Sequence, residues 1–391
     1  MNKLDRFNNK MGDFKLRIVN KLIAILSCYK DNMERNDYIK SIRTSYQKLT
    51  NKTELSSEQE EEIQTYYTRL LGHSVPLDWH RYFSARTGVY SKFYIPTSEY
   101  KTNIVGRLNI YPLKRAYTDK NITDIFLQET HQPKIYIKNM NGYYYADNRP
   151  ISKEKALELC KNLGEVMIKP SLTGRGEGVK KIRISNGVVK TEGKTIEQLF
   201  DDYRSDFLIE SVICQHEQMK ALNPTSVNSI RIVTFRSGMD IFVIYTVIRI
   251  GRKDQVVDNE SSGGISAIIR EDGTLGKYAY GAPGYDKIEY TDSGIKLEGY
   301  QIPSYQSVIN VAKASHYHLP YFDLVGWDFA IEEDGSPVLI EFNMTPDLSQ
   351  SANGPAFGRY TEAIIEEAMK KSNTWSRITQ ERMWRKNVIK K

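Results

Sequence analysis

The sequence predicts an α+β fold that carries a helical, basic extension at its N-terminus. Its 391 residues are 40% hydrophobic and 26% charged, an ordinary globular composition that excludes wholesale disorder. Apolar residues recur at helical spacing in the first 72 residues, and from residue 151 helical patterns alternate with short strand-like runs. A chain of this length is also expected to divide into more than one domain.

These patterns divide the chain into five expected segments. A helical extension over 1–72 is followed by an α/β portion over 73–150. A subdomain with a glycine-rich loop is expected over 151–212, a second subdomain over 213–373, and a basic tail over 374–391.

Two helices are expected in the extension. Phe14–Tyr29 has apolar residues at helical spacing on one side and basic residues on the other. Ser57–Leu71 is favoured as a second helix, because Ser56 can cap its N-terminus and glutamates fill its first turn. Residues 75–150 are tyrosine-rich and interrupted by turn signals such as Asn141-Gly142.

From residue 151 the pattern alternates between helix and strand. The expected helices are Ser152–Leu163, Ile196–Tyr203, Ser304–Tyr317 and Tyr360–Met369. The expected strands are Val166–Pro170, Val179–Ser185, Val188–Lys190, Phe207–Glu210, Ser229–Arg236, Ile241–Ile250, Gly264–Arg270, Leu324–Ile331 and Pro337–Asn343.

Charge is distributed unevenly along the chain. The formal net charge of +7 comprises +7 over residues 1–52, +5 over 374–391 and −5 over the body between them. A nucleic-acid-binding protein is expected to carry its positive charge on the folded body, so we expect no nucleic-acid partner. The basic ends leave two alternatives open: peripheral contact with anionic lipid, or an N-terminal helix packed on the body and a solvated tail.

The sequence also bears on location. No apolar run approaches the ~18 residues that a membrane-spanning helix needs, and the N-terminus lacks the apolar core of a signal peptide. Cys28, Cys160 and Cys214 are widely spaced and form no CxxC pair, which favours reduced thiols over a disulfide framework. We therefore expect a cytoplasmic protein, with peripheral contact at the inner face of the cell membrane as the option that the basic ends leave open.

A glycine-rich loop joins two of the expected strands. Lys169 lies at the end of the first strand, and Gly174, Gly176 and Gly178 alternate with other residues before the second. Backbone N–H groups of such a loop can approach an anion closely, and the lysine adds a positive charge. The loop lacks the pattern of a Walker or Rossmann motif. We interpret it as a mobile flap over phosphates, with an ordinary flexible hairpin as the alternative.

A tight hairpin is predicted between the last two strands, with its turn at 333–336. With a two-residue loop at Asp334-Gly335, counting back along both strands places Asp328 opposite Glu341. Asn343 shares the face of Glu341, because side chains alternate along a strand. A one-residue bulge in the hairpin would break this register.

Asp328, Glu341 and Asn343 together predict a metal site. Directly opposed carboxylates have Cβ atoms about 4.5–5.5 Å apart and repel each other unless a cation lies between them. Two carboxylates and an amide oxygen are hard ligands that suit Mg²⁺ shared with phosphate oxygens. The alternative is a protonated or lysine-paired couple of carboxylates on the sheet face.

A third stretch, Phe207–Glu210 followed by Val212-Ile213, is an apolar strand that ends in an acidic residue and an apolar hinge. Such a hinge can present backbone groups to the edge of an adenine ring. Taken alone, an edge strand that enters a loop explains the same pattern.

In their order along the chain, these motifs resemble the ATP-grasp superfamily, and more narrowly its members associated with sugar transfer and polysaccharide gene clusters. The resemblance covers about residues 119–348. The matching stretches are Lys169–Val179, Glu210–Glu217, Asn228–Thr234, Asp258-Asn259, Gly263-Gly264, Gly326–Ala330 and Glu341–Leu348. The resemblance implies an ATP-grasp fold, in which two α+β subdomains clamp ATP.

The resemblance also implies roles for the matching residues. ATP would be bound by Lys120, Lys169, Gly174, Gly176, Gly178, Glu210, Val212, Ile213 and Glu217. Mg²⁺, as two ions, would be bound by Asp328, Glu341 and Asn343. Arg231 and Arg249 would hold the transferred phosphate or the acceptor carboxylate, and Asn228, Asp258, Gly263 and Gly264 would lie at the acceptor.

The implied activity is that of an ATP- and Mg²⁺-dependent carboxylate–amine ligase. Such enzymes phosphorylate a carboxylate with the γ-phosphate, and an amine then displaces phosphate from the acylphosphate. We expect an amino acid or other amine to be joined to a sugar carboxylate, or the reverse, in bacterial surface polysaccharide synthesis. Two alternatives remain: a kinase of the same fold that phosphorylates a hydroxyl, and a non-catalytic nucleotide-binding scaffold of a glycan assembly complex.

Overall fold

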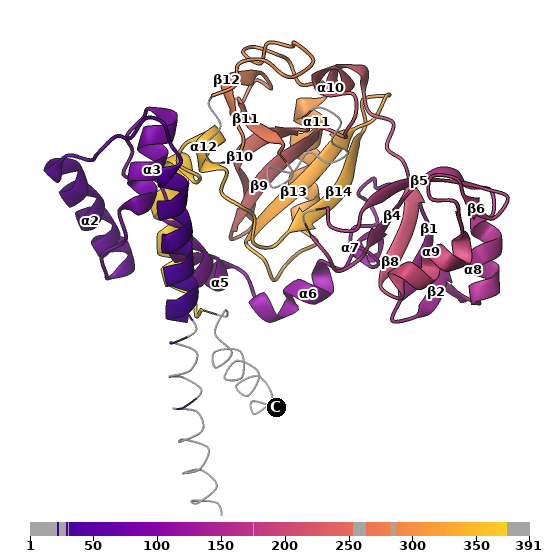
Figure 1. Cartoon of the computed structure of the whole chain (residues 1–391). Helices are drawn as coiled ribbons and strands as arrows, with labels where there is room; N and C mark the ends of the chain where they lie inside the picture. Colours follow the sequence, from indigo (N-terminus) through magenta and orange to yellow (C-terminus); the bar gives the residue numbers. More distant parts are fainter. Residues whose placement is uncertain are drawn as a thin grey trace, which may run out of the picture. The chain divides into compact units, whose positions relative to one another are not determined.

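The computed structural model describes residues 22, 29, 31–174, 176–252, 263–282 and 287–373. The chain divides into two compact units. The first comprises Met1–Pro112 and Gly354–Lys391, and the second comprises Leu113–Asn353. Figure 1 labels many of the elements of both units.

The first unit is built from helices. Residues 31–47 form a helix, which is followed by α2 (Ser57–Leu71), α3 (Asp78–Thr87), α4 (Thr97–Glu99), the π-helical η1 (Tyr100–Ile104), α5 (Val105–Leu108), η2 (Tyr111–Leu113), η4 (Gly358–Tyr360) and α13 (Thr361–Met369). The helix α2 has its predicted bounds, because Ser56 and Gln59 cap it reciprocally: each side chain accepts from the backbone N–H of the other.

Two predictions fall largely outside the described residues. The segment Phe14–Tyr29 is described only at Leu22 and Tyr29, and the basic tail over 374–391 is not described. Among the helices of the described ranges, none combines the length and the apolar character that crossing a membrane requires.

The second unit contains two antiparallel sheets. The eight strands of the first sheet are β1 (Ile135–Met140), β2 (Tyr143–Ala146), β3 (Arg149–Ile151), β4 (Gly164–Pro170), β5 (Lys180–Ser185), β6 (Val188–Val189), β7 (Lys194–Thr195) and β8 (Phe207–Ser211), in the order β3-β2-β1-β8-β4-β5-β6-β7. The helices α8 (Lys153–Cys160) and α9 (Ile196–Tyr203) pack on this sheet (Figure 1). Cys160 and Phe200 thereby join a core that includes Ile168 and Ile209 of the strands.

The second sheet has six strands: β9 (Ser229–Ser237), β10 (Asp240–Ile250), β11 (Ile265–Ile269), β12 (Leu275–Tyr280), β13 (Leu324–Ile331) and β14 (Pro337–Asn343), in the order β12-β11-β10-β9-β13-β14. The helix α11 (Tyr305–His316) packs on one face and shares a core with Ile232 and Trp327. The described residues of this unit also form four short helices: α6 (Lys114–Tyr117), α7 (Thr123–Phe126), α10 (Glu217–Leu222) and α12 (Gln350–Asn353). Because side chains alternate along each strand, the polar residues between these core residues lie on the opposite face.

The first sheet begins earlier than the sequence pattern indicates. The strands β1, β2 and β3 have no counterpart among the expected strands, and the boundary expected between residues 150 and 151 lies inside β3. The strand β12 was also not expected. The alternation of inward and outward side chains in β2 cannot be recognised in the sequence, because successive residues are all tyrosine. Tyr144 stacks on Phe200 with ring centroids 5.4 Å apart, whereas Tyr143 is exposed.

The β13–β14 hairpin differs from its predicted form and yet keeps the predicted pair. Glu332 N–H donates to Ser336 O, so the loop is three residues long and the predicted two-residue loop was wrong. A one-residue bulge in β14 then shifts the pairing back by one residue, so that Asp328 pairs with Glu341 as predicted. The predicted register at these carboxylates is confirmed because the two deviations cancel.

Candidate active site

A cavity of about 160 Å³ lies between the two sheets of the second unit. We call it the nucleotide cavity. Its lining includes apolar side chains (Met167, Val179, Val212, Ile213, Val227 and Ile340) and charged ones (Lys120, Lys169, Glu210, Arg249, Asp328 and Glu341), with Thr173, Gly176, Ser211 and Ser229. Most of the residues predicted from the sequence to bind ATP or metal therefore meet at one place.

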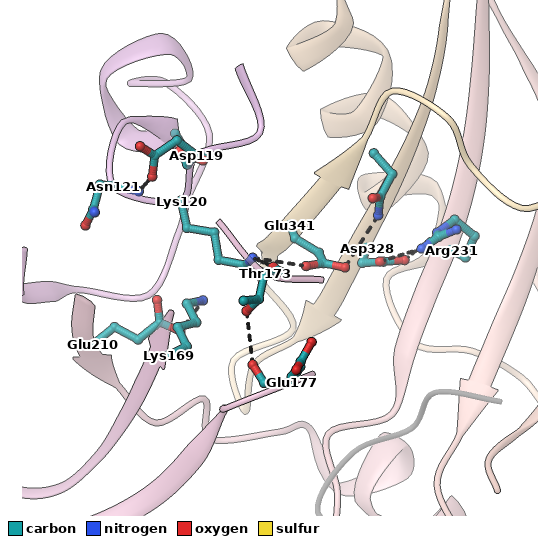
Figure 2. A network of polar contacts seen from close by, with 12 residues as sticks. Asp119, Lys120, Asn121, Lys169, Thr173, Glu177, Glu210, Arg231, Asp328 and Glu341 are labelled. Carbon is teal, nitrogen blue, oxygen red and sulfur yellow. Dashed lines mark hydrogen bonds and ion pairs between the residues drawn. The ribbon is translucent and has the colours of Figure 1, made fainter. Parts of the chain in front are cut away.

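Asp328 is held by arginines from two neighbouring strands. Arg231 lies opposite it on β9, and its Nε and Nη2 donate to Oδ1 and Oδ2 at 2.5 and 2.7 Å (Figure 2). Arg249 Nη1 lies 3.4 Å from Oδ2. Burial alone raises the pKa of Asp328, but the attraction of Arg231 and Arg249 outweighs it and lowers this pKa below its usual value. Asp328 is therefore an ionised carboxylate inside the protein.

Glu341 lies beside Asp328 and connects to Lys120. Asn343 Nδ2 donates to Glu341 Oε1 at 3.4 Å, and Lys120 Nζ lies 3.9 Å from Glu341 Oε2. Lys120 Nζ also donates to the backbone oxygen of Thr173 at 2.5 Å, as Figure 2 shows. Burial lowers the pKa of Lys120; Glu341 opposes this shift, and Lys169 adds to it. Lys120 thus joins the glycine-rich loop to the strand that carries Glu341.

Lys169 is paired with an acidic residue from the neighbouring strand. Its Nζ lies 2.6 Å from Glu210 Oε1, and the two side chains are only 8% and 9% exposed. The two strands that carry them, β4 and β8, are adjacent in the first sheet. Glu210 therefore fixes the position of the Lys169 ammonium group in the wall of the nucleotide cavity.

The oxygens at Asp328, Glu341 and Asn343 fit a divalent cation. A carboxylate has about four lone-pair positions. Arg231 uses one on each oxygen of Asp328, and Arg249 lies at a second position on Oδ2. In the described ranges no cluster of three His, Cys, Asp or Glu side chains able to hold a metal occurs. Two carboxylates and the Asn343 amide oxygen would therefore share the ion with oxygens of a ligand, which is the usual arrangement for Mg²⁺.

Comparison with known proteins identifies the family. The chain matches, over residues 99–365, the family described as sugar-transfer associated ATP-grasp. The chain belongs to this ATP-grasp family. Membership confirms the resemblance and the fold class predicted from the sequence, and it supports an ATP-dependent, nucleotide-binding enzyme. No curated protein sequence gives a significant match.

Solved structures of low sequence identity are also similar to this ATP-grasp chain. D-alanine–D-alanine ligase from Bacillus anthracis is 14% identical, the match covers 68% of this chain and 69% of that chain, and the TM-score is 0.38. For biotin carboxylase from Campylobacter jejuni the identity is 12%, the coverage 68% and 48%, and the TM-score 0.40. VanG D-Ala:D-Ser ligase from Enterococcus faecalis is 13% identical, the match covers 65% of this chain and 61% of that chain, and the TM-score is 0.38.

The glycines of the ATP-grasp flap lie in different surroundings. Gly176 lines the nucleotide cavity, whereas Gly174 lines a second, neighbouring cavity. Gly178 has φ +73°, and a Cβ there would lie 2.7 Å from Pro170 Cγ, so this position requires glycine for packing. Arg175, between Gly174 and Gly176, lies outside the described residues.

Several predicted site residues do not line the nucleotide cavity. Glu217 is the first residue of α10, next to the capping His216. Asn228 is fully buried, and its amide donates to the backbone oxygens of Met219 and Asn223, which holds the preceding turn together. Gly263 and Gly264 directly precede β11, and Asp258 lies outside the described residues.

Arg231 also differs from its predicted position. It is buried beside Asp328 on the neighbouring strand and is not in the lining of the nucleotide cavity, whereas Arg249 is. Sequence reasoning in turn missed Met167, Ser229 and Ile340 in the lining. Met167 precedes Lys169 by two residues on β4, so strand alternation alone could have placed both on one face.

Proposed function

We propose that this protein is an ATP- and Mg²⁺-dependent carboxylate–amine ligase that acts through an acylphosphate in the synthesis of a bacterial surface polysaccharide. One observation carries the proposal. In a chain of the ATP-grasp family, the opposed Asp328 and Glu341 lie in one cavity with Lys120 and Lys169, which come from other parts of the fold. This arrangement suits a polyphosphate and its cation.

In this proposal the nucleotide cavity holds ATP by two kinds of contact. Met167, Val212 and Ile213 offer an apolar surface for adenine, and the backbone of the hinge offers hydrogen bonds to its edge. The ammonium groups of Lys169 and Lys120 suit the phosphates, because lysine binds phosphate oxygens as a positive point charge. Glu210 keeps Lys169 in place. Glu217 remains a proposed ribose contact outside the described lining.

Asp328, Glu341 and Asn343 are the residues that would hold Mg²⁺. When bound there, the cation supplies neutralisation of the charge on the phosphate oxygens. Arg249, which lines the nucleotide cavity, adds positive charge at the transferred phosphate. We propose that Arg231 holds Asp328 in position and does not contact phosphate, because its guanidinium is buried against that carboxylate.

The proposed reaction has two steps. An oxygen of the acceptor carboxylate attacks the γ-phosphorus, the bond to the β–γ bridging oxygen breaks, and ADP leaves. The amine nitrogen then attacks the acyl carbon and loses a proton, and the carbon–oxygen bond to phosphate breaks. The products are an amide and inorganic phosphate, which leaves with that proton. The flap over 173–178 excludes water, which would otherwise hydrolyse the acylphosphate.

The substrates are proposed from the family. Its description associates these ATP-grasp proteins with sugar transfer, which supports a sugar carboxylate or an aminated glycan precursor as one partner. Peripheral contact with a membrane through the basic ends is a further proposal, since residues 374–391 and, apart from Leu22 and Tyr29, residues 1–30 lie outside the described residues. Co-sedimentation with anionic liposomes at low salt tests that contact, and its absence would contradict it.

A trapping assay tests the proposed activity. The purified protein is incubated with ATP, Mg²⁺, hydroxylamine and a panel of uronic acids and amino acids, and hydroxamate and inorganic phosphate are measured. A ligase yields hydroxamate and phosphate in equal amounts, because hydroxylamine captures the acylphosphate. A kinase yields ADP and a stable phosphorylated product without hydroxamate, and a scaffold binds ATP without turnover; either result would contradict the proposal.

A further inference from the structure

Both ends of the flap are bound to one short turn that follows α9. Ser171, just before the flap, donates its backbone N–H to the backbone oxygen of Asp206 at 2.6 Å. At the other end, the Tyr203 hydroxyl donates to the backbone oxygen of Gly178 at 2.6 Å. Tyr203 is the last residue of α9, and Asp206 directly precedes β8. Residues 203–206, which we call the mount, therefore hold both ends of the loop between β4 and β5.

The mount has a strained backbone that contacts with the first sheet hold in place. Arg204 and Asp206 have φ values of +61° and +60°, a left-handed conformation that residues other than glycine seldom adopt. Such a conformation persists only where the surrounding structure enforces it. The Asp206 backbone N–H donates to Asn139 Oδ1 at 3.3 Å, and Asp206 Oδ1 accepts from the backbone N–H of Asn141 at 2.9 Å. The mount is thereby fixed to the β1–β2 hairpin.

The Tyr203 side chain is held in position as a hydrogen-bond donor. Its ring packs against the core of the first sheet, with its centroid 5.7 Å from that of Phe207. Burial is the largest cause that raises the pKa of Tyr203 to about 12. The phenol therefore keeps its proton at neutral pH and donates it to the backbone oxygen of Gly178.

The tip of the flap, residues 173–177, is attached to the rest of the second unit less firmly than the two ends. Thr173 Oγ1 donates to the backbone oxygen of Glu177 at 3.0 Å, which closes the tip on itself (Figure 2). Among the described residues of the tip, the one hydrogen bond to a residue distant in the chain joins Lys120 Nζ to Thr173 O. The tip is thus a closed loop held between the mount and Lys120.

The position of the tip bears on the proposed reaction. Thr173 and Gly176 line the nucleotide cavity, and Lys120 is one of the two lysines proposed to bind the phosphates. Water that passes the tip would attack the phosphorus of the acylphosphate and break its bond to the acyl oxygen. This side reaction regenerates the carboxylate and releases inorganic phosphate and a proton, so ATP is consumed without formation of an amide.

We propose that Tyr203 is a positioning residue of the ligase, whose hydroxyl holds one end of the flap so that the tip stays over the nucleotide cavity and protects the acylphosphate from water. This inference rests on the proposed ligase function. Tyr203 is not in the lining of the nucleotide cavity and acts through Gly178. Loss of its hydroxyl should therefore increase hydrolysis of the intermediate and leave ATP binding nearly unchanged, because Lys120 and Lys169 are retained.

The test compares Tyr203→Phe with the matched control Tyr300→Phe. Each substitution keeps the ring and removes one hydroxyl that donates to a backbone oxygen, that of Gly178 at 2.6 Å or that of Gln218 at 2.7 Å. Tyr300 lies between β12 and α11, outside the flap, the mount and the lining of the nucleotide cavity. Phosphate and hydroxamate are measured in the hydroxylamine assay with a carboxylate that yields hydroxamate with the wild type, and ATP affinity is measured by calorimetry.

We expect Tyr203→Phe to raise the ratio of phosphate to hydroxamate at least threefold, because water then competes better with hydroxylamine. Its ATP affinity should change less than twofold, and Tyr300→Phe should match the wild type in both measurements. A variant that had merely lost stability would lose phosphate and hydroxamate in equal proportion. An unchanged ratio in Tyr203→Phe, or an equal rise in Tyr300→Phe, overturns the role of Tyr203 while the ligase function stands.

Hydrogen exchange of the full-length protein provides a second measurement that needs no carboxylate. The backbone N–H groups of residues 171–179 should exchange several-fold faster in Tyr203→Phe than in the wild type or Tyr300→Phe, because exchange reports local opening. Equal exchange in all three proteins overturns the inference. Absence of hydroxamate from the wild type with every carboxylate overturns the proposed function and this inference with it.

Discussion

Arg231 and Asp328 lie directly opposite each other on β9 and β13, and the guanidinium donates to both oxygens of the carboxylate while each side chain is only 4% exposed. Glu341 is the partner of Asp328 on the other side, in β14. Asp328 therefore has an arginine on one side and a glutamate on the other. The arginine compensates the cost of keeping two carboxylates side by side.

Arg231→Met is expected to destabilise the protein strongly. It leaves Asp328 buried without its main partner, and breaking a buried pair in this way costs about 3–5 kcal/mol. The midpoint of urea unfolding measures the loss. Arg252→Met is the control, because the Arg252–Asp292 pair is about 30% exposed and such pairs contribute roughly 0–1 kcal/mol. Equal midpoints for the two variants would contradict the role given to Arg231.

Glu341→Gln is expected to reduce the Mg²⁺-dependent part of ATP binding at least tenfold, because an amide is a weaker ligand than a carboxylate for a hard cation. Binding in the absence of Mg²⁺ should change little, since the lysines remain. Calorimetry with and without Mg²⁺ separates the two effects. Glu333→Gln, an exposed residue of the same hairpin, is the control. Unchanged Mg²⁺ dependence in Glu341→Gln would remove Glu341 from the metal site.

Lys169→Met is expected to weaken ATP binding at least tenfold, which corresponds to about 1.4 kcal/mol. The substitution removes a buried positive charge from the nucleotide cavity and leaves Glu210 without its ion-pair partner. The additional variant Lys169→Met/Glu210→Gln removes that unpaired charge. It should recover stability to heat but not ATP affinity. Lys181→Met, on the neighbouring strand β5 and exposed, should behave as the wild type. Recovery of ATP affinity in the double variant would show that the role of Lys169 is structural.

Because two histidines are buried, we expect the free energy of unfolding to fall in mild acid. His80 in the first unit and His316 in the second are fully buried, and burial lowers the pKa of each to about 4. In the unfolded chain the pKa of a histidine is about 6.5. Between about pH 4 and about pH 6.5 the unfolded state therefore binds protons that the folded state does not bind. Stability is therefore complete above about pH 6.5 and falls by up to about 1.4 kcal/mol per pH unit per histidine below it.

Urea unfolding at a series of pH values from 7 to 4.5 measures this slope. His316→Gln should reduce the slope of stability against pH, because the unfolded variant binds one proton fewer. His318→Gln, at an exposed position, should leave the slope unchanged. The same slope in wild type and His316→Gln would show that His316 is not a neutral, buried group. The contacts of its ring nitrogens with Thr234 Oγ1 at 2.7 Å and Phe322 O at 2.9 Å are consistent with the neutral form.

Local patterns in the sequence were enough to predict the bounds of those helices and strands that depend on residues close together in the chain. The bounds of α2, α9, β13 and β14 follow from capping residues and from apolar periodicity. The pairing of Asp328 with Glu341 follows from a hairpin, whose register depends on a short turn. The pair is present although the predicted hairpin had neither a three-residue loop nor a bulge, because these two deviations cancel.

The residue pattern was sufficient to predict the family, the fold class and the three oxygen-bearing side chains of the hairpin. It contained no signal that Arg231 lies beside Asp328, that Glu210 pairs with Lys169, or that Lys114 lines a second cavity. The partners in these contacts lie far apart along the chain. These contacts join strands and loops that become neighbours only when the sheets form, and the periodicity of a strand contains no information about which strand will lie beside it.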